Sequence, residues 1–170
     1  MVRTLLLLRH AKAEPLGSSG RDFDRPLAPR GHEDAKRVGR ALAAMKIVPD
    51  AIVTSSAVRA KETAEGVAKA CGFEGSLRET RALYDTAGET WLTVLATLPS
   101  SADVALLVAH NPGIEELAAE LAGAPTGFVS CPTAGLIAFE TDASSWKSLD
   151  EQPATMRWFL RPKLIEAITG

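Results

Sequence analysis

Arginine and histidine side chains follow short apolar runs at three places in this chain of 170 residues. Arg9 and His10 come directly after the first run. Arg59 comes shortly after a second run, and His110 comes directly after a later one. Guanidinium groups bind tetrahedral oxyanions through paired N–H donors, and helix N-termini add backbone donors. If these side chains meet, the combination predicts an anion site, which we interpret as a phosphate site.

The two imidazoles have different tasks in such a site. One can attack phosphorus as a nucleophile, while the other donates hydrogen bonds to the equatorial oxygens as charge develops in the transition state. The sequence contains no P-loop of the form G-x-x-x-x-G-K-S/T and no carboxylate cluster suited to magnesium. We therefore hypothesise metal-free phosphoryl transfer through a phosphohistidine, with no cofactor.

The elements that would position these residues can be predicted from the pattern of apolar runs. Short apolar runs alternate with amphipathic stretches, which is typical of repeated βα units. The last two runs are joined by a short polar segment, which favours antiparallel pairing between them. The pattern predicts one domain over 1–170, a three-layer α/β/α sandwich with a mainly parallel central sheet. We expect strands at Val2–Leu8, Ala51–Thr54, Ser76–Leu83, Val104–Ala109, Gly135–Thr141 and Met156–Leu160.

A parallel sheet explains how residues from distant parts of the sequence could form one site. The carboxyl ends of parallel strands share one edge, beside the N-termini of the following helices, and ligands bind there. Apolar positions three or four residues apart predict the helices. They are expected from Arg30 to Met45, on Ala60–Cys71 after the N-cap candidates Ser55 and Ser56, around Trp91–Leu98, and from Pro112 onward.

Other polar and aromatic residues have simpler explanations. His32 lies among charged residues in the first turn of the 30–45 helix, so we expect it on a solvated face. Trp91, Trp146 and Trp158 are expected to pack in or near the core, because no basic stripe accompanies them. The proline- and glycine-containing segment 13–30 is expected to be a long loop near the first strand.

The overall charge excludes several classes of partner. Lys plus Arg is 19 and Asp plus Glu is 21, a formal net charge of −2. No global positive field is therefore available to hold nucleic acid or a membrane surface, and any anion site must be local.

The apolar run Leu5–Leu8 is too short for a signal-peptide core or a membrane span, so we expect a cytoplasmic protein. Cys71 and Cys131 suggest neither a zinc site nor a disulfide framework.

Three segments carry a resemblance to a known family. The segment 8–11 (LRHA) is similar to an R-H-G signature, 55–64 (SSAVRAKETA) to the motif S-x-x-x-R-A-x-x-T-A, and 108–113 (VAHNPG) to a third motif. Together they resemble the histidine phosphatase superfamily, which has the phosphoglycerate-mutase-like fold. The segments 24–31 and 131–135 are similar to those of its short SixA-like phosphohistidine phosphatase branch.

The resemblance implies a role for each matching residue. His10 would be the nucleophile that becomes transiently phosphorylated. Arg9, Arg59 and His110 would form the phosphate pocket. Asn111 would orient the loop or the substrate.

Further candidate residues lie in the loop after the first strand and in the middle of the chain. Arg21 and Arg25 lie in the loop expected to overhang the site and could contact substrate, with solvated loop arginines as the alternative. The family's general acid is a mid-chain Glu, and here only Asp85 and Glu89 lie in the corresponding region, with ordinary surface carboxylates as the alternative. The signature also has Ala11 where the family has Gly, and a methyl group fits there if φ is negative.

The weak signal for an acid bears on the substrate. An alkoxide leaving group needs a proton in the transition state, whereas imidazole leaving from phosphohistidine needs less help. We therefore expect a metal-independent phosphatase that acts on a histidine-phosphorylated protein through a phosphoenzyme on His10. The alternatives are a phosphomonoesterase that acts on a small phosphate ester, and a non-catalytic module that binds phosphate or a phosphoprotein.

Overall fold

A computed structural model of the chain describes residues 2–17, 20–85, 89–151 and 154–169. Its centre is a six-stranded sheet with the strand order β3-β2-β4-β1-β5-β6. The strands are β1 (Arg3–Arg9), β2 (Ala51–Ser55), β3 (Arg78–Thr80), β4 (Val104–Ala109), β5 (Leu136–Thr141) and β6 (Thr155–Leu160). The α-helices are α1 (Pro29–Ala44), α2 (Val58–Cys71), α3 (Ala82–Asp85), α4 (Glu89–Leu95), α5 (Gly113–Leu121) and α6 (Pro162–Thr169). Two 3-10 helices, η1 (Asp22–Asp24) and η2 (Trp146–Glu151), lie in the connections.

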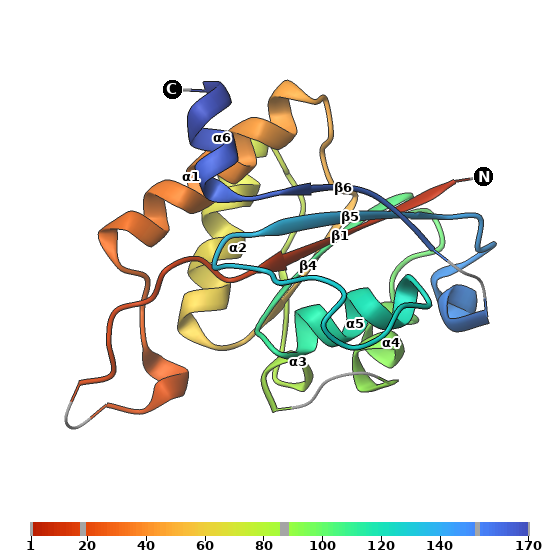
Figure 1. Ribbon diagram of the computed structural model, residues 1–170, viewed down its shortest axis with the longest axis horizontal. Helices are drawn as coiled ribbons and strands as arrows, with labels where there is room; N and C mark the ends of the chain where they lie inside the picture. Colours follow the sequence, from red (N-terminus) through yellow and green to blue (C-terminus); the bar gives the residue numbers. More distant parts are fainter. Residues whose placement is uncertain (1, 18–19, 86–88, 152–153, 170) are drawn as a thin grey trace.

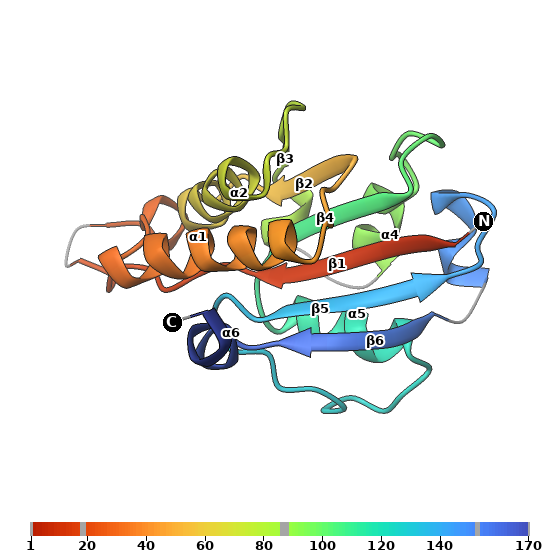
Figure 2. The same ribbon diagram turned by 90° about the horizontal axis from the view of Figure 1, so that it is seen from above.

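The central strands β1, β2, β4 and β5 are buried on both faces, whereas the edge strands β3 and β6 are partly exposed. Leu5 and Leu7 of β1 pack in one cluster with apolar residues of α4, α5 and η2. Leu6 and Leu8 point to the other face and pack with α1, α2 and Ile165 of α6. This alternation follows from the two-residue period of a strand. Figures 1 and 2 show the resulting layers, and the structure confirms the predicted α/β/α sandwich.

The strand directions place the ends of β1, β2 and β4 at one edge of the sheet. β1 and β2 both pair with β4 in parallel. Arg9 lies opposite Ala109 in this register, and the His10 backbone N–H donates to the Ala109 carbonyl at 2.9 Å. The residues that follow β1 and β4 are therefore neighbours in space. β5 pairs antiparallel with both β1 and β6, so the predicted antiparallel pairing of the last two strands is confirmed.

Some predicted elements are wrong in extent. The strand expected at Ser76–Leu83 is only Arg78–Thr80, because the chain turns into α3 directly after pairing with β2. The N-cap of α2 is Ala57, so the expected caps Ser55 and Ser56 are wrong. Ser55 instead ends β2, and its hydroxyl oxygen accepts from the Ala57 N–H at 3.3 Å. The sequence pattern also gave no indication of α6, a short helix that buries little beyond Ile165.

Candidate active site

The two histidines predicted to do chemistry face one another at this edge of the sheet. The ring centroids of His10 and His110 are 5.0 Å apart, and the rings are inclined at 54°. The Arg59 Nε lies 3.3 Å from His10 Nε2. His10 follows β1, Arg59 lies in the first turn of α2 and His110 follows β4. The structure therefore brings together residues from three segments that are 49 and 51 positions apart.

One hydrogen bond sets the tautomer of His10. Its Nδ1 lies 2.8 Å from the carbonyl oxygen of Ala11, which can only accept. The proton therefore sits on Nδ1, and Nε2 carries a lone pair that faces Arg59. Burial lowers the pKa of His10 to about 4, and the charges of Arg59 and Arg9 act in the same direction. His10 is thus neutral at neutral pH, as a nitrogen nucleophile must be.

Ala11 is the residue at which the chain departs from the expected glycine. Its φ is not positive, so the methyl group introduces no backbone strain. The side chain is fully buried, and the backbone N–H donates to the Thr63 hydroxyl at 3.0 Å. That hydroxyl in turn donates to the Arg59 carbonyl at 2.6 Å. Thr63 therefore ties the segment after β1 to the first turn of α2 and fixes His10 relative to Arg59.

Ser55 holds His110 in place. The sequence pattern did not indicate this role for Ser55. His110 Nε2 lies 2.8 Å from the Ser55 hydroxyl, and both residues are buried. The hydroxyl oxygen also accepts from the Ala57 N–H, so its own proton is available for Nε2. We assign the ring proton of His110 to Nδ1, because Nε2 can accept from the Ser55 hydroxyl while Nδ1 is a buried atom without a partner among the described residues, free to donate to an anion. Burial, and then the charges of His10 and Arg59, lower the pKa of His110 to about 3.

Replacing Ser55 by alanine is expected to lower kcat/KM about tenfold, the effect of losing one net hydrogen bond of roughly 1.4 kcal/mol. The His110 ring would lose the contact that keeps its proton on Nδ1. Steady-state kinetics on an aryl phosphate would measure the change. Ser56→Ala is the matched control, because Ser56 contributes only its backbone N–H, which donates to Thr80. Equal rates in Ser55→Ala and the wild type would contradict this role.

Arg9 ends β1 and is oriented by the loop before β5. Its Nη1 donates to the Cys131 carbonyl at 2.9 Å, while its Nε is buried without a partner among the described residues. The Asn111 side-chain amide donates to the same carbonyl at 3.0 Å and to Glu115 at 2.7 Å. Glu115 also accepts from the Cys131 N–H at 2.8 Å. Asn111 therefore orients the loop that holds Arg9, and Glu115 is a supporting residue that the sequence pattern did not reveal.

Two unpaired donors remain in this constellation, Arg9 Nε and His110 Nδ1. A buried donor without an acceptor costs about 1–3 kcal/mol, and such groups recur at functional sites. Both belong to side chains that would contact an oxyanion here. A tetrahedral anion beside His10 Nε2 would supply the missing acceptors, so the arrangement fits phosphate.

Asp22 in η1 lies at the mouth of the site. The sequence pattern did not indicate this residue either. Its carboxylate accepts from Arg59 Nη2 at 2.9 Å, from Arg25 Nη1 at 2.8 Å and from the Tyr84 hydroxyl at 3.1 Å. Arg25 therefore reaches the site through Asp22, whereas Arg21 is exposed and its side chain makes no hydrogen bond within the described ranges. The loop was recognisable from its prolines and glycines, but its path over Arg59 was not.

Asp85 and Glu89 are the two predicted candidates for the general acid. Asp85 ends α3 and Glu89 begins α4, and their side chains lie outside the described residues. His32 has the expected solvated position, with a half-exposed side chain whose Nε2 is 4.0 Å from a Glu62 carboxylate oxygen. Across the described ranges, no three His, Cys, Asp or Glu side chains are grouped as metal ligands would be.

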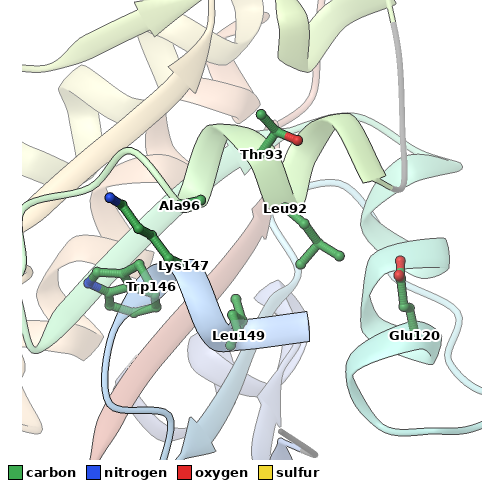
Figure 3. Close-up of a pocket in the computed structure, with 7 residues that line it drawn as sticks. All are labelled: Leu92, Thr93, Ala96, Glu120, Trp146, Lys147 and Leu149. Atoms are coloured by element: carbon green, nitrogen blue, oxygen red, sulfur yellow. The ribbon is translucent and has the colours of Figure 1, made fainter. Parts of the chain in front are cut away.

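A separate hollow lies far from this site. It has a volume of about 400 Å³ and lies between α4, the end of α5 and η2 (Figure 3). Trp146, which lines it, lies under the Arg3 guanidinium, whose central carbon is 5.6 Å from the ring centroid. Arg3 begins β1, whereas His10 follows its other end. None of the histidines or arginines of the candidate site lines this hollow.

A helix that spans a membrane must be both long and strongly apolar. Among the described residues, no helix meets both requirements.

The lowered histidine pKa values predict a loss of stability in mild acid. Below about pH 6.5 an unfolded histidine binds a proton, while His10 and His110 stay neutral in the folded protein until about pH 4 and 3. The unfolded state then holds more protons, so the free energy of unfolding falls as pH drops, by up to about 1.4 kcal/mol per pH unit for each histidine. Calorimetry should give a lower Tm at about pH 5 than at about pH 7. A His10→Gln/His110→Gln variant should show a flatter dependence, and an unchanged slope would contradict the assignment.

The chain is similar in sequence to known proteins. A family model described as histidine phosphatase superfamily (branch 1) matches residues 5–99. An uncharacterised protein of Arabidopsis thaliana is 34% identical over 85% of this chain and 69% of that protein. An uncharacterised protein of Mycobacterium leprae is 29% identical over 92% of this chain and 100% of that protein.

Solved structures show the same fold over nearly the whole chain. A Nakamurella multipartitia protein provisionally named phosphohistidine phosphatase SixA has a TM-score of 0.81 and 28% identity, covering 95% of this chain and 97% of that one. An Agrobacterium tumefaciens protein with the same provisional name has a TM-score of 0.79 and 27% identity, covering 94% and 98%. The protein histidine phosphatase SixA complexed with tungstate has a TM-score of 0.80 at 22% identity, covering 94% and 97%.

Proposed function

The chain belongs to the histidine phosphatase superfamily, and we propose that it hydrolyses phosphohistidine in proteins through a covalent phosphate on His10. Residues 1–170 act as one catalytic domain in this proposal, and no metal ion takes part. The observation that carries it is the state of His10, a neutral imidazole whose Nε2 lone pair lies 3.3 Å from Arg59 Nε. A nucleophilic role uses both the lone pair and the surrounding positive charge.

In the first step, the Nε2 lone pair of His10 forms a bond to phosphorus. The bond between phosphorus and the leaving nitrogen breaks, and its electron pair stays on that nitrogen. Arg9, Arg59 and the Nδ1–H of His110 donate to the phosphoryl oxygens. The hydrogen bond from His10 Nδ1–H to the Ala11 carbonyl strengthens as the His10 ring becomes positively charged.

In the second step, water attacks phosphorus and the phosphorus–Nε2 bond breaks. The electron pair returns to Nε2, and phosphate leaves as H₂PO₄⁻ with both protons of the water. His10 is again neutral, with its proton on Nδ1. The residues that bound the first transition state bind the second, because its oxygens carry the same charge.

Phosphohistidine is the favoured substrate class for two reasons. Its imidazole leaving group is a weaker base than an alkoxide and needs less protonation. Asp22, the carboxyl group that contacts Arg59, is ionised and has no proton to donate at neutral pH. The likeness to two proteins provisionally named phosphohistidine phosphatase SixA supports the same class. The partner in this proposal is a protein phosphorylated on histidine.

A substrate panel tests the proposal. Wild-type protein, with a chelator present, would be given a histidine-phosphorylated protein, phosphoimidazole, 4-nitrophenyl phosphate and sugar phosphates. We expect the highest kcat/KM for the phosphohistidine compounds. Faster turnover of sugar phosphates would instead indicate a small-molecule phosphomonoesterase. Phosphate binding without turnover of any compound would indicate a binding module.

A further inference from the structure

The carboxylate of Asp22 is the one acidic group that the described structure places against the catalytic arginine. Arg59 Nη2 donates to its Oδ2 at 2.9 Å, and Arg59 Nη1 donates to its backbone carbonyl at 2.6 Å. Arg59 Nε contacts His10 Nε2, so Asp22 lies one side chain away from the nucleophile. Its side chain is 45% exposed, so a substrate can reach it from solvent.

The charge of Asp22 is fixed by its neighbours. Partial burial raises its pKa, but hydrogen bonds from Arg25 and Arg59 outweigh this and bring the pKa to about 2. At neutral pH the group is therefore an acceptor only and cannot protonate a leaving group. A negative charge at this place also repels a phosphate ester. It favours a substrate that presents a positive charge or an N–H beside its phosphoryl group.

Phosphate binding does not require Asp22 to leave. Arg59 has five N–H donors, and its contacts with His10 and Asp22 use three of them. Two donors remain for phosphoryl oxygens, and the Nε–H is released when His10 Nε2 turns to phosphorus. Asp22 can therefore stay at the mouth of the site throughout the reaction.

The surroundings of Asp22 suit a flat ring. The Tyr84 hydroxyl donates to Asp22 Oδ2 at 3.1 Å, and the Tyr84 ring packs edge-on against His110 with centroids 5.5 Å apart. Phe23, the next residue in η1, packs edge-on against Tyr84 at 5.0 Å. The aromatic pair Phe23 and Tyr84 thus lies beside the Asp22 carboxylate, where the ring of a leaving group could pack.

We propose that Asp22 recognises the leaving group: it accepts a hydrogen bond from the ring nitrogen of phosphohistidine that does not carry phosphorus. This inference rests on the proposed function and names the residue that selects its substrate class. A carboxylate beside that nitrogen favours its protonated form. The substrate is then an imidazolium ion, whose ring needs no further proton to leave. Asp22 thereby replaces the general acid of an esterase.

The step balances without a proton transfer to phosphorus or to the leaving nitrogen. The His10 Nε2 lone pair forms the new phosphorus–nitrogen bond, and the electron pair of the old bond stays on the leaving nitrogen. The departing ring keeps its one proton on the other nitrogen, hydrogen-bonded to Asp22, and leaves as neutral imidazole. The positive charge passes to the His10 ring, whose Nδ1–H faces the Ala11 carbonyl.

The test compares two substrates in Asp22→Asn, a variant that preserves the shape of the side chain and one acceptor oxygen, replaces the other oxygen by an NH₂ donor, and removes the charge. For phosphoimidazole we expect kcat/KM to fall about 10- to 100-fold, the effect of losing a hydrogen bond to a charged group. For 4-nitrophenyl phosphate, which has no ring nitrogen, we expect a much smaller fall, because only the contact of Asp22 with Arg59 is altered. Asp24→Asn is the matched control, because Asp24 is an exposed aspartate of the same 3-10 helix. It should leave both substrates unaffected.

The outcomes separate this inference from the proposed function. Equal losses for both substrates would mean that Asp22 only positions Arg59, and unchanged rates would mean that it does neither; each overturns the inference. Turnover of 4-nitrophenyl phosphate but not of phosphoimidazole by the wild type would overturn the proposed function itself. Continued turnover of 4-nitrophenyl phosphate by Asp22→Asn shows that the variant is folded.

Discussion

Replacing His10 by alanine is expected to lower kcat roughly 10⁴-fold or more, the range seen when a covalent nucleophile is removed. The variant loses the Nε2 lone pair beside Arg59, and no other described group can take its place. The neighbouring imidazole of His110 cannot substitute, because its Nε2 is bound to Ser55 and its Nδ1 carries the proton. Steady-state rates on phosphoimidazole and 4-nitrophenyl phosphate would measure the loss.

The chain offers a matched control for this variant. His32 is the third histidine, it is half-exposed in the first turn of α1, and among the described residues it pairs with Glu62 and not with His10, Arg59 or His110. His32→Ala should therefore keep wild-type activity. Wild-type rates in His10→Ala would mean that phosphoryl transfer does not pass through this residue. Thermal unfolding of both variants would show whether a lost activity reflects lost structure.

Replacing Arg59 by lysine is expected to lower kcat/KM about 10²- to 10³-fold, as removal of a transition-state donor does. Lysine keeps the positive charge but cannot reproduce the planar fork. That fork reaches His10 through Nε and Asp22 through both Nη atoms. Phosphoimidazole and 4-nitrophenyl phosphate should lose rate equally, since both need the phosphoryl oxygens bound. Inhibition by vanadate should weaken as well.

Arg40→Lys is the matched control, because Arg40 is an exposed residue of α1. The pattern also contrasts with that of Asp22→Asn, which is expected to affect phosphoimidazole much more than 4-nitrophenyl phosphate. Kinetic constants close to wild type in Arg59→Lys would show that charge alone suffices at this position. Such a result would contradict the claim that the directed hydrogen bonds of the Arg59 guanidinium are needed for catalysis.

The positions of His10, Arg59 and His110 could be predicted because they depend on strand direction. Parallel pairing of β1 and β2 with β4 brings the ends of these strands to one edge, whatever the details of the loops. Apolar runs predict such strands well, since buried strands are continuous in hydrophobicity. The layers of the fold could be predicted for the same reason.

The contacts of Ser55 and Asp22 could not be predicted in this way. Ser55 fits the general preference for serine before a helix, but its hydroxyl is bound to His110 instead of capping α2. Asp22 lies in a loop whose path depends on its contacts with Arg59, Arg25 and Tyr84, which come from distant parts of the chain. Sequence spacing indicates which elements meet, whereas loop contacts depend on the assembled fold.

Trapping the phosphoenzyme tests whether catalysis passes through a covalent phosphate on His10. The wild-type protein would be mixed with a protein carrying labelled phosphohistidine, quenched at alkaline pH within the first turnover, and digested for mass spectrometry. We expect the label on the peptide that contains His10, and its disappearance in the same experiment with His10→Ala. Label on another residue, or rapid hydrolysis with no labelled peptide at any time point, would contradict the mechanism.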